Sequence, residues 1–329
     1  MRTQEVHLLA RPDGMPTRAQ FAVVEADIPD PQEGEVLVEN IYLSVDPAMR
    51  PRLAGQQALN EAMLGGAIGR VLKSRHTDFA VGDYVHSMRG FRTHFVAPAK
   101  ELSKIEADGM PLDAYMSVLG LTGLTAYGGL LVIGALKDGE NVFVSAAAGA
   151  VGSIAAQIAK VKGCYVIGSA GSDEKCRWLK EDLKLDAVIN YRQETLRTAL
   201  KAAAPKGIDV YFENVGGEHL NAALPRMNPL GRIALCGMIS AYNNFGAVSE
   251  PVTTLSNMIY TRVTMRGFVY YEFDSKRAQF LADMKSWLRA GRIQYRSTFV
   301  DGIAKAPDAL IGLFTGANTG KMLVRLGNP

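Results

Sequence analysis

The pattern of apolar and polar positions changes part-way along this chain of 329 residues. Up to about residue 121, short apolar stretches are separated by turn residues, as in "GEVLVENIYLSV", "GAIGRVLKS" and "FAVGDYVHSM". Few windows in this part repeat with the period of about 3.6 residues that marks an amphipathic helix. Short strands between turns predict a mostly β, barrel-like domain.

From about residue 122, apolar strands alternate with helical stretches. The predicted strands are "NVFVSA", "CYVIGS", "DAVINY", "DVYFENV", "GRIALCG" and "TMRGFVY", with helices such as "SIAAQIAKVKG" and "SDEKCRWLKEDL" between them. This alternation predicts an α/β domain with a doubly wound parallel sheet, whose ligands bind at the carboxyl ends of the strands. Residues 274–293 predict an amphipathic helix that ends at Gly291, and "GKMLVRL" predicts one more strand that returns to the first domain. We expect a first domain of residues 1–121, completed by about 300–329, and a cofactor domain of residues 122–299.

Length, composition and charge agree with a two-domain soluble protein. Apolar residues make up 48% of the chain and charged residues 21%, and the scattered basic residues leave a net charge of only +3, which argues against extended nucleic-acid binding. The most nearly continuous apolar run is mostly Ala, Gly and Ser and is interrupted by Gln157 and Lys160, so it predicts a strand, turn and helix rather than a membrane span. The N-terminus lacks the features of a secretory signal, and the 3 cysteines form no disulfide framework, which favours a cytoplasmic location.

The turn between the first strand and first helix of the cofactor domain is rich in small residues. Compared with the G-x-G-x-x-G pattern, "AAAGAVG" has Ala147 in the first glycine position and Gly149 and Gly152 in the other two. Gly149 lets the backbone approach a pyrophosphate, Gly152 lets the helix pack on the strand, and the helix N-terminus attracts the phosphates. A βα turn without a ligand is the alternative, but the succession of further βα units favours a dinucleotide site.

The stretch "VIGSAGSDEKCRWL" determines which dinucleotide is expected. The acid that binds the adenosine ribose of NAD lies at the tip of the second strand, which we place at Gly168 and Ser169; neither is acidic. Asp173 and Glu174 follow Ser172, a residue typical of a helix N-cap, and acids are favoured in a first helical turn without any ligand. The sequence therefore predicts a ribose pocket without an acid.

Two further residues favour NADP(H) over NAD(H). Lys175, in the first turn of that helix, can pair with a 2′-phosphate, and the hydroxyl of Tyr191, at the end of the third strand, can donate to it. The alternatives are a solvated helix lysine and an ordinary aromatic residue at a strand end.

Several motifs together resemble one family. "FAVGDYV", "GLTGLTAYGGL", "AAAGAVGSIAAQIAK", "NVGGE" and "GANTGKMLV" resemble the medium-chain dehydrogenase/reductase superfamily, and "LSVDPAMR", "YFENVGG" and "CGMISAYN" resemble its zinc-independent prostaglandin reductase branch, the leukotriene B4 12-hydroxydehydrogenase-like alkenal/enone reductases. The resemblance covers nearly the whole chain. It implies a GroES-like catalytic domain, a Rossmann cofactor domain, NADPH dependence and reduction of an activated C=C bond. It also implies a homodimer formed through edge strands of the cofactor domains.

The resemblance also implies which residues contact the cofactor. They comprise the phosphate turn, the two candidate 2′-phosphate partners, a residue at the tip of the fourth strand, a nicotinamide-side segment, the end of the sixth strand and one residue near the chain's end. In that order they are Gly149, Ala150, Val151, Gly152, Lys175, Tyr191, Asn214, Cys236, Gly237, Met238, Ile239, Ser240, Tyr242, Phe268, Val269, Tyr270 and Asn318.

No metal site is expected. Where zinc alcohol dehydrogenases of the superfamily carry a Cys ligand before a His-Asp or His-Ser pair, this sequence has Ser44 and Val45, and a catalytic zinc needs three protein ligands. The five histidines, His7, His76, His86, His94 and His219, show no paired ligand spacing. We interpret them as surface or strand residues.

The expected reaction is hydride addition to the β-carbon of an enone. The enolate oxygen that results would be held by the hydroxyl of Tyr242, the expected catalytic residue, by the nicotinamide ribose, or by both. Residues 243–254 and Ala48, which depart from the branch's usual pattern, are expected to border the substrate pocket. Two other functions remain open: a quinone oxidoreductase of the same superfamily, and a non-catalytic NADPH-binding sensor or structural protein.

Overall fold

The computed structural model describes residues 1–244 and 251–328, and its contacts divide the chain into two compact units. Unit 1 comprises Met1–Met116 and Ser297–Pro329, and unit 2 comprises Ser117–Arg296. Residues 245–250 of the loop expected at the substrate pocket lie outside the described residues. The assignment of residues 1–121 with 300–329 to catalysis and 122–299 to the cofactor stays a prediction.

Unit 1 is built on a seven-stranded sheet, with a separate antiparallel pair of β1 (Arg2–Leu8) and β2 (Phe21–Asp27). The sheet runs in the order β14 (Ser297–Asp301), β15 (Lys321–Arg325), β3 (Glu35–Ser44), β4 (Ala67–Ser74), β5 (Tyr84–Ser87) and β7 (Ser103–Lys104), and β6 (His94–Pro98) also pairs with β3. The C-terminal strand β15 therefore does return to the first unit, as predicted. The predicted barrel is not closed by hydrogen bonds. Within the described chain, β14 and β7 are the two edge strands of this sheet and do not pair with each other.

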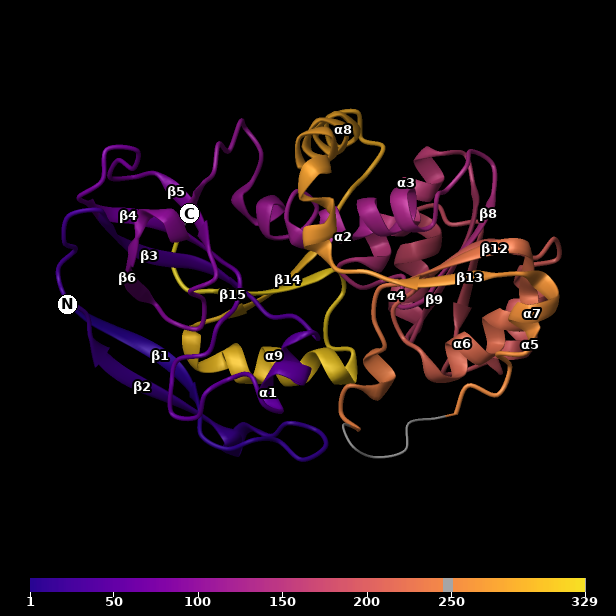
Figure 1. The fold of residues 1–329 in the computed structure, drawn as a ribbon, viewed down its shortest axis with the longest axis horizontal. Helices are drawn as coiled ribbons and strands as arrows, with labels where there is room; N and C mark the ends of the chain where they lie inside the picture. The colour runs from indigo at the N-terminus through magenta and orange to yellow at the C-terminus, as the bar shows by residue number, and fades with distance from the viewer. Residues whose placement is uncertain (245–250, 329) are drawn as a thin grey trace. The chain divides into compact units, whose positions relative to one another are not determined.

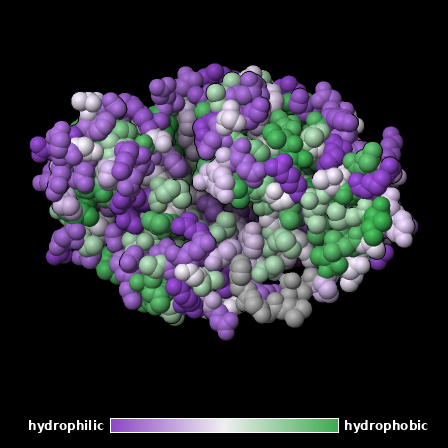
Figure 2. All heavy atoms as spheres, viewed as in Figure 1, coloured by the Kyte–Doolittle hydropathy of each residue, from purple (hydrophilic) through white to green (hydrophobic). Residues whose placement is uncertain are grey.

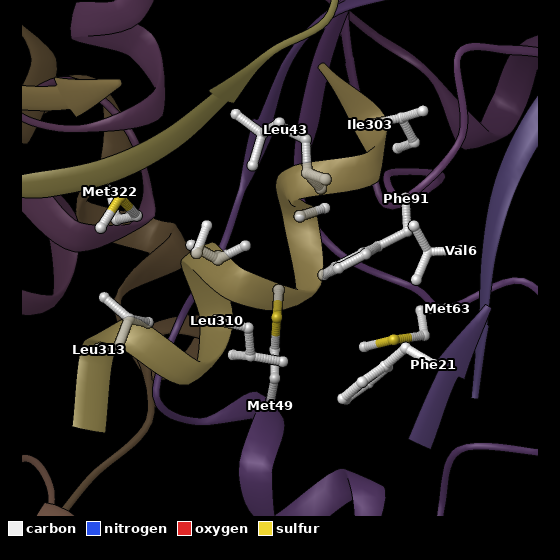
Figure 3. Packing of buried hydrophobic residues seen from close by; sticks show 14 of the residues in the cluster. Val6, Phe21, Leu43, Met49, Met63, Phe91, Ile303, Leu310, Leu313 and Met322 are labelled. Atoms are coloured by element: carbon white, nitrogen blue, oxygen red, sulfur yellow. The ribbon is translucent and has the colours of Figure 1, made fainter. Parts of the chain in front are cut away.

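Helix α9 (Ala306–Thr315) from the end of the chain completes the core of unit 1. Figure 3 shows its Leu310 and Leu313 near Met49 of α1 (Met49–Leu53), and Val6 beside Phe91. Because these buried residues come from both ends of the chain, unit 1 cannot form its core without residues 297–328.

Unit 2 contains a six-stranded sheet in which every pair of neighbouring strands is parallel (Figure 1). Its order is β10 (Ala187–Asn190), β9 (Tyr165–Ala170), β8 (Asn141–Val144), β11 (Ile208–Glu213), β12 (Met227–Leu235) and β13 (Thr264–Gly267). The strand order reverses between β8 and β11, and in sheets of this kind ligands bind at the carboxyl ends of the strands at that point. The predicted doubly wound parallel sheet is confirmed.

The helices of unit 2 cover both faces of this sheet, as the alternating sequence pattern predicts. They are α2 (Leu121–Gly128), α3 (Gly152–Val161), α4 (Asp173–Arg177), α5 (Leu196–Ala203), α6 (Gly217–Ala223), α7 (Asn257–Thr261) and α8 (Arg277–Arg289), with π-helical turns Gly129–Ile133 and Trp178–Asp182 continuing α2 and α4. Apolar residues of α5 and α6 pack with Phe143, Ile167 and Tyr211 of the strands in one cluster. Helix α8 ends before Gly291, whose φ of 65° is left-handed, so the predicted stop is confirmed.

The predicted tip of the second strand is wrong by two residues. Strand β9 continues through Ala170, so Gly168 and Ser169 lie inside the sheet and not at its end. A Cβ on Gly168 would lie 2.6 Å from Leu185 Cδ2 and 2.9 Å from Ala147 Cβ, so this glycine permits close packing rather than a turn. The tip is formed by Ala170 and Gly171, and it too carries no acid.

Candidate cofactor and active site

The phosphate turn joins β8 to α3 and has the geometry expected of its glycines. A Cβ on Gly152 would lie 2.4 Å from the Ala146 carbonyl oxygen, closer than real contacts allow, so only glycine lets the helix begin here. Gly149, Ala150 and Val151 remain partly exposed, which leaves backbone accessible at the start of α3. Ala146 adopts a left-handed φ of 47°, so this alanine makes the tight turn without a glycine.

A buried carboxyl group connects the ends of β8 and β11. Glu213 is fully buried, and its Oε1 accepts hydrogen bonds from Ser145 Oγ at 2.7 Å and from the Val215 amide at 2.6 Å. Asn214 is held in turn, since its amide donates to Ser145 Oγ and its side chain donates to the Ser145 carbonyl. Burial raises the pKa of the Glu213 carboxyl. The phosphate turn and Asn214 therefore leave the sheet from one hydrogen-bonded junction.

The predicted nicotinamide-side segment, residues 236–242, rests on the same junction. The Cys236 and Gly237 amides donate to the Glu213 carbonyl, and the Ile239 amide donates to the Asn214 carbonyl. Ser240 donates through its amide and its hydroxyl to the Val215 carbonyl. The structure thus brings together three of the predicted cofactor segments: the turn, Asn214 and residues 236–242.

Within this segment, Tyr242 is the residue whose hydroxyl fits a catalytic role. Its oxygen accepts a hydrogen bond from the Met238 amide at 3.3 Å, which orients the group and leaves its proton for another acceptor. Burial raises the pKa of Tyr242 above its usual value, so the hydroxyl is protonated at neutral pH. Burial also raises the pKa of the Cys236 thiol to about 12, which keeps it from acting as a thiolate nucleophile.

The two predicted 2′-phosphate partners, Lys175 and Tyr191, lie near the tip of β9, and a second cationic residue, Arg192, lies with them. A Cβ on Gly171 would be 2.6 Å from the Tyr191 hydroxyl oxygen and 3.3 Å from Arg192 Nε, so both side chains reach this glycine. Partial burial lowers the pKa of Lys175, and the nearby Arg192 charge lowers it further. The Tyr191 hydroxyl and the Arg192 guanidinium at Gly171, with the Lys175 charge near Arg192, suit a doubly charged phosphate.

The two acids that follow this tip belong to helix α4, as predicted. Ser172 is the N-cap, and its hydroxyl accepts a hydrogen bond from the Lys175 amide. Asp173 accepts hydrogen bonds from the side chains of Asn190 and Gln193, which lower its pKa. This carboxylate thus secures the turn after β10 that carries Tyr191 and Arg192.

The remaining predicted cofactor residues differ in burial and in the unit to which they belong. The Phe268 ring is buried against Phe212 and Phe273, so only its backbone can reach a ligand, while Val269 and Tyr270 are exposed. Asn318 belongs to unit 1, where its side chain donates to the Gly320 carbonyl. Their contacts with the cofactor stay predictions.

The stretch from Ser44 to Asp46, where the resemblance implies that zinc dehydrogenases carry their ligands, holds an ion pair with Lys321. The ammonium of Lys321, which is 2% exposed, donates to the Val45 carbonyl at 2.8 Å and to Asp46 Oδ1 at 2.9 Å, and Ser44 donates to the other carboxylate oxygen. Across residues 1–244 and 251–328, no group of three or more His, Cys, Asp or Glu side chains is arranged to hold a metal ion. The metal-free interpretation stays a prediction.

One histidine was misinterpreted. His219 lies neither on the surface nor in a strand but on helix α6, where it is 4% exposed. Glu213 and Arg192 were not among the residues predicted from the sequence. An acid that ends the apolar strand "DVYFE" and an arginine directly after Tyr191 are the signals that could have identified them.

Comparison with known proteins identifies the family. Residues 4–105 match the family described as the N-terminal domain of oxidoreductase, and residues 150–286 match zinc-binding dehydrogenase. The chain is 43% identical to prostaglandin reductase 1 of Bos taurus over 95% of each chain, and 42% identical to the NADP(+)-dependent 2-alkenal reductase of Nicotiana tabacum over 88% of this chain and 87% of the relative. The crystal structure of CurA in complex with NADPH from Vibrio vulnificus superposes with a TM-score of 0.94 at 38% identity, covering 99% of this chain and 100% of CurA.

This chain belongs to the medium-chain dehydrogenase/reductase superfamily, in its prostaglandin reductase branch. The predicted resemblance and the predicted fold class, a GroES-like β-rich domain with a Rossmann domain, are therefore confirmed. In this member of the superfamily, none of the helices that the structure describes has the length and apolar character needed to cross a bilayer.

Proposed function

We propose that this protein is an NADPH-dependent reductase of the C=C bond in α,β-unsaturated aldehydes and ketones. The observation that carries the choice of coenzyme is the acid-free tip of β9, where the Tyr191 hydroxyl and the Arg192 side chain lie at Gly171 and Lys175 lies near Arg192. The predicted enzyme class, an NADP-dependent oxidoreductase, and the predicted coenzyme, NADP(H), agree with the names of the relatives and are confirmed. The relatives' names also support the predicted reaction, reduction of an activated C=C bond, and leave the substrate itself open.

The residues of unit 2 fit the parts of this coenzyme one by one. The pyrophosphate would lie on Gly149, Ala150, Val151 and Gly152 at the N-terminus of α3, where free amides and the helix dipole favour an anion. The 2′-phosphate would lie at Gly171, and the nicotinamide beside Asn214 and residues 236–242. Val269, Tyr270 and the backbone of Phe268 complete the proposed site in unit 2; the role of Asn318 stays a prediction.

Within the proposed mechanism, Tyr242 stabilises the charge that develops on the substrate. When bound, NADPH supplies the hydride that adds to the β-carbon. The π electrons of the C=C bond then move toward the carbonyl, whose oxygen becomes an enolate. The Tyr242 hydroxyl, oriented by the Met238 amide, donates a hydrogen bond to that oxygen, and the α-carbon is protonated afterwards. This path needs no Lewis acid, because conjugation spreads the charge that a metal would otherwise neutralise.

Consumption of NADPH with a panel of carbonyl substrates tests the proposed function. We expect turnover with 4-hydroxynonenal and with long-chain enones, and none with the saturated analogues. Preferential turnover of simple quinones would favour a quinone oxidoreductase. Coenzyme binding without turnover of any member of the panel would favour a sensor or structural protein.

Replacing Tyr242 by phenylalanine tests the catalytic assignment. Removing one donor from a developing oxyanion typically lowers kcat by about a hundredfold or more, so we expect a loss of this size with an enone and little change in the KM for NADPH. The matched control is Tyr165→Phe on strand β9, whose hydroxyl donates to the Ala203 carbonyl at the surface. A kcat in Tyr242→Phe equal to that of the control would remove Tyr242 from the mechanism.

We further propose that the protein is a homodimer assembled through β13. This strand pairs only with β12 among the described elements, so its outer edge offers backbone groups to a second copy. Before it, α7 exposes Ile259 and Tyr260 by 74% and 84%, and apolar residues gather in this region of unit 2 in Figure 2. We expect sedimentation at micromolar concentration to give twice the chain mass of 35.6 kDa, and the double variant Ile259→Asp, Tyr260→Asp to give the monomer. A monomeric parent protein would contradict the proposal.

The location that we propose is the cytoplasm. All three cysteines are free, as in proteins of a reducing compartment. Fractionation of the source cells would test this assignment.

A further inference from the structure

A buried histidine lies directly beneath one of the residues that would hold the 2′-phosphate. The rings of His219 and Tyr191 meet edge to face, with centroids 5.0 Å apart and an interplanar angle of 77°. Nothing in the proposed chemistry uses this imidazole, and it lies too deep in unit 2 to meet a substrate, being 4% exposed.

The imidazole is fixed on its other side by the sheet. His219 Nε2 shares a hydrogen bond of 3.1 Å with the hydroxyl of Ser169, which is fully buried in β9 between β8 and β10. Burial lowers the pKa of His219 to about 4, so the ring is uncharged at neutral pH. The Nε2 atom of a neutral imidazole needs no charged partner, and the neutral Ser169 hydroxyl suffices. Ser169 therefore determines where the imidazole lies, and the Tyr191 ring packs against the imidazole.

Tyr191 lies at the margin of the sheet, where its partly buried ring packs against the apolar cluster of unit 2. It follows the last residue of β10, its ring is partly exposed, and its hydroxyl lies at Gly171 beside Arg192. An edge-to-face aromatic contact of this kind stabilises one orientation of the Tyr191 ring.

We propose that His219 is a positioning residue for coenzyme selection: the contacts from Ser169 through His219 to Tyr191 hold the Tyr191 hydroxyl where the 2′-phosphate binds. The inference rests on the proposed function, since it takes NADPH to be the coenzyme. NADH lacks the 2′-phosphate, so a residue that acts only through Tyr191 changes the binding of NADPH and leaves that of NADH as it was.

The test is steady-state kinetics of His219→Leu with each coenzyme. We expect the KM for NADPH to rise by about three- to tenfold and the KM for NADH to stay within about twofold, as loss of one aromatic contact implies. In a Tyr191→Phe background, the same substitution should have no further effect on the KM for NADPH, because the hydroxyl that it positions is already absent. The matched control is His94→Leu in unit 1, which should leave the ratio of the two KM values unchanged.

A histidine that merely supports the fold gives a different result. An equal rise of both KM values in His219→Leu, or an undiminished effect in the Tyr191→Phe background, would overturn the inference. If His219→Leu does not fold, Ser169→Ala removes only the hydroxyl that anchors the imidazole and should shift the ratio in the same direction; an unchanged ratio there also overturns it.

Failure of the proposed function gives a result different from failure of this inference alone. A parent protein that binds NADPH and NADH equally in a direct titration contradicts the coenzyme assignment, and the inference falls with it. A parent protein that discriminates between them while the His219 and Ser169 variants do so equally well contradicts the inference alone.

Discussion

Replacement of Gly152 by alanine should abolish productive NADPH binding. The new Cβ would lie 2.4 Å from the Ala146 carbonyl oxygen and 3.0 Å from Ala147 Cα, both backbone atoms, so the turn itself must move. Overpacking of this kind costs about 1–3 kcal/mol of folding stability, and the displaced amides no longer point at a pyrophosphate. We expect a lower Tm together with a rise of about a hundredfold or more in the KM for NADPH, measured by thermal unfolding and by initial rates.

Gly149→Ala separates the two roles of the turn. A Cβ there would meet only the Ala146 carbonyl oxygen, at 3.2 Å, so the folded state tolerates it with a small adjustment. We expect Tm to change little while the KM for NADPH rises, because the added methyl stands where the pyrophosphate approaches. Gly55→Ala, with open space around its Cβ, is the control for both substitutions. Normal NADPH affinity in both turn variants would contradict the placement of the pyrophosphate.

The second large effect concerns coenzyme preference, which Lys175→Ala should reduce. A hydrogen bond to a charged group contributes about 1.5–3 kcal/mol, so the ratio of the KM for NADH to that for NADPH should fall by about ten- to a hundredfold. Arg192→Ala should lower the ratio less, because this guanidinium is more exposed and better screened by salt. Kinetics with both coenzymes at low and high ionic strength would measure each contribution.

The control for this prediction lies on the same helical segment. Lys180 donates to the Asp186 carbonyl and is exposed, so Lys180→Ala removes a positive charge without touching the tip of β9. The ratio of the KM for NADH to that for NADPH in Lys180→Ala should match that of the parent protein. A parent protein that uses NADH and NADPH equally well would contradict the coenzyme assignment itself.

Local chemistry made much of this fold predictable. The N-cap at Ser172, the stop at Gly291 and the alternation of strands and helices each depend on residues a few positions apart. Such signals are present in the sequence whatever the rest of the chain does. For the same reason, the residues around Asp173 and Glu174 are sufficient to assign these two acids to a helix.

The strand tip at Gly168 shows where local reasoning fails. A glycine near a strand end ordinarily signals a turn, yet here it makes room for Ala147 and Leu185, which approach from elsewhere in the chain. His219 was misjudged for a related reason: nothing near it in the sequence indicates a buried partner, because Ser169 lies on another strand.

By itself, the sequence determined the alternating elements, the small-residue turn after β8 and the absence of an acid from the tip of β9. Only the tertiary structure decided that Gly171, Tyr191 and Arg192 meet beside Lys175, that Glu213 joins two strand ends, and that His219 supports Tyr191. The physical reason is the range of the interactions. Caps and periodicity act within a few residues, whereas these contacts depend on the order in which parallel strands pair, and that order is set by burial of the whole sheet.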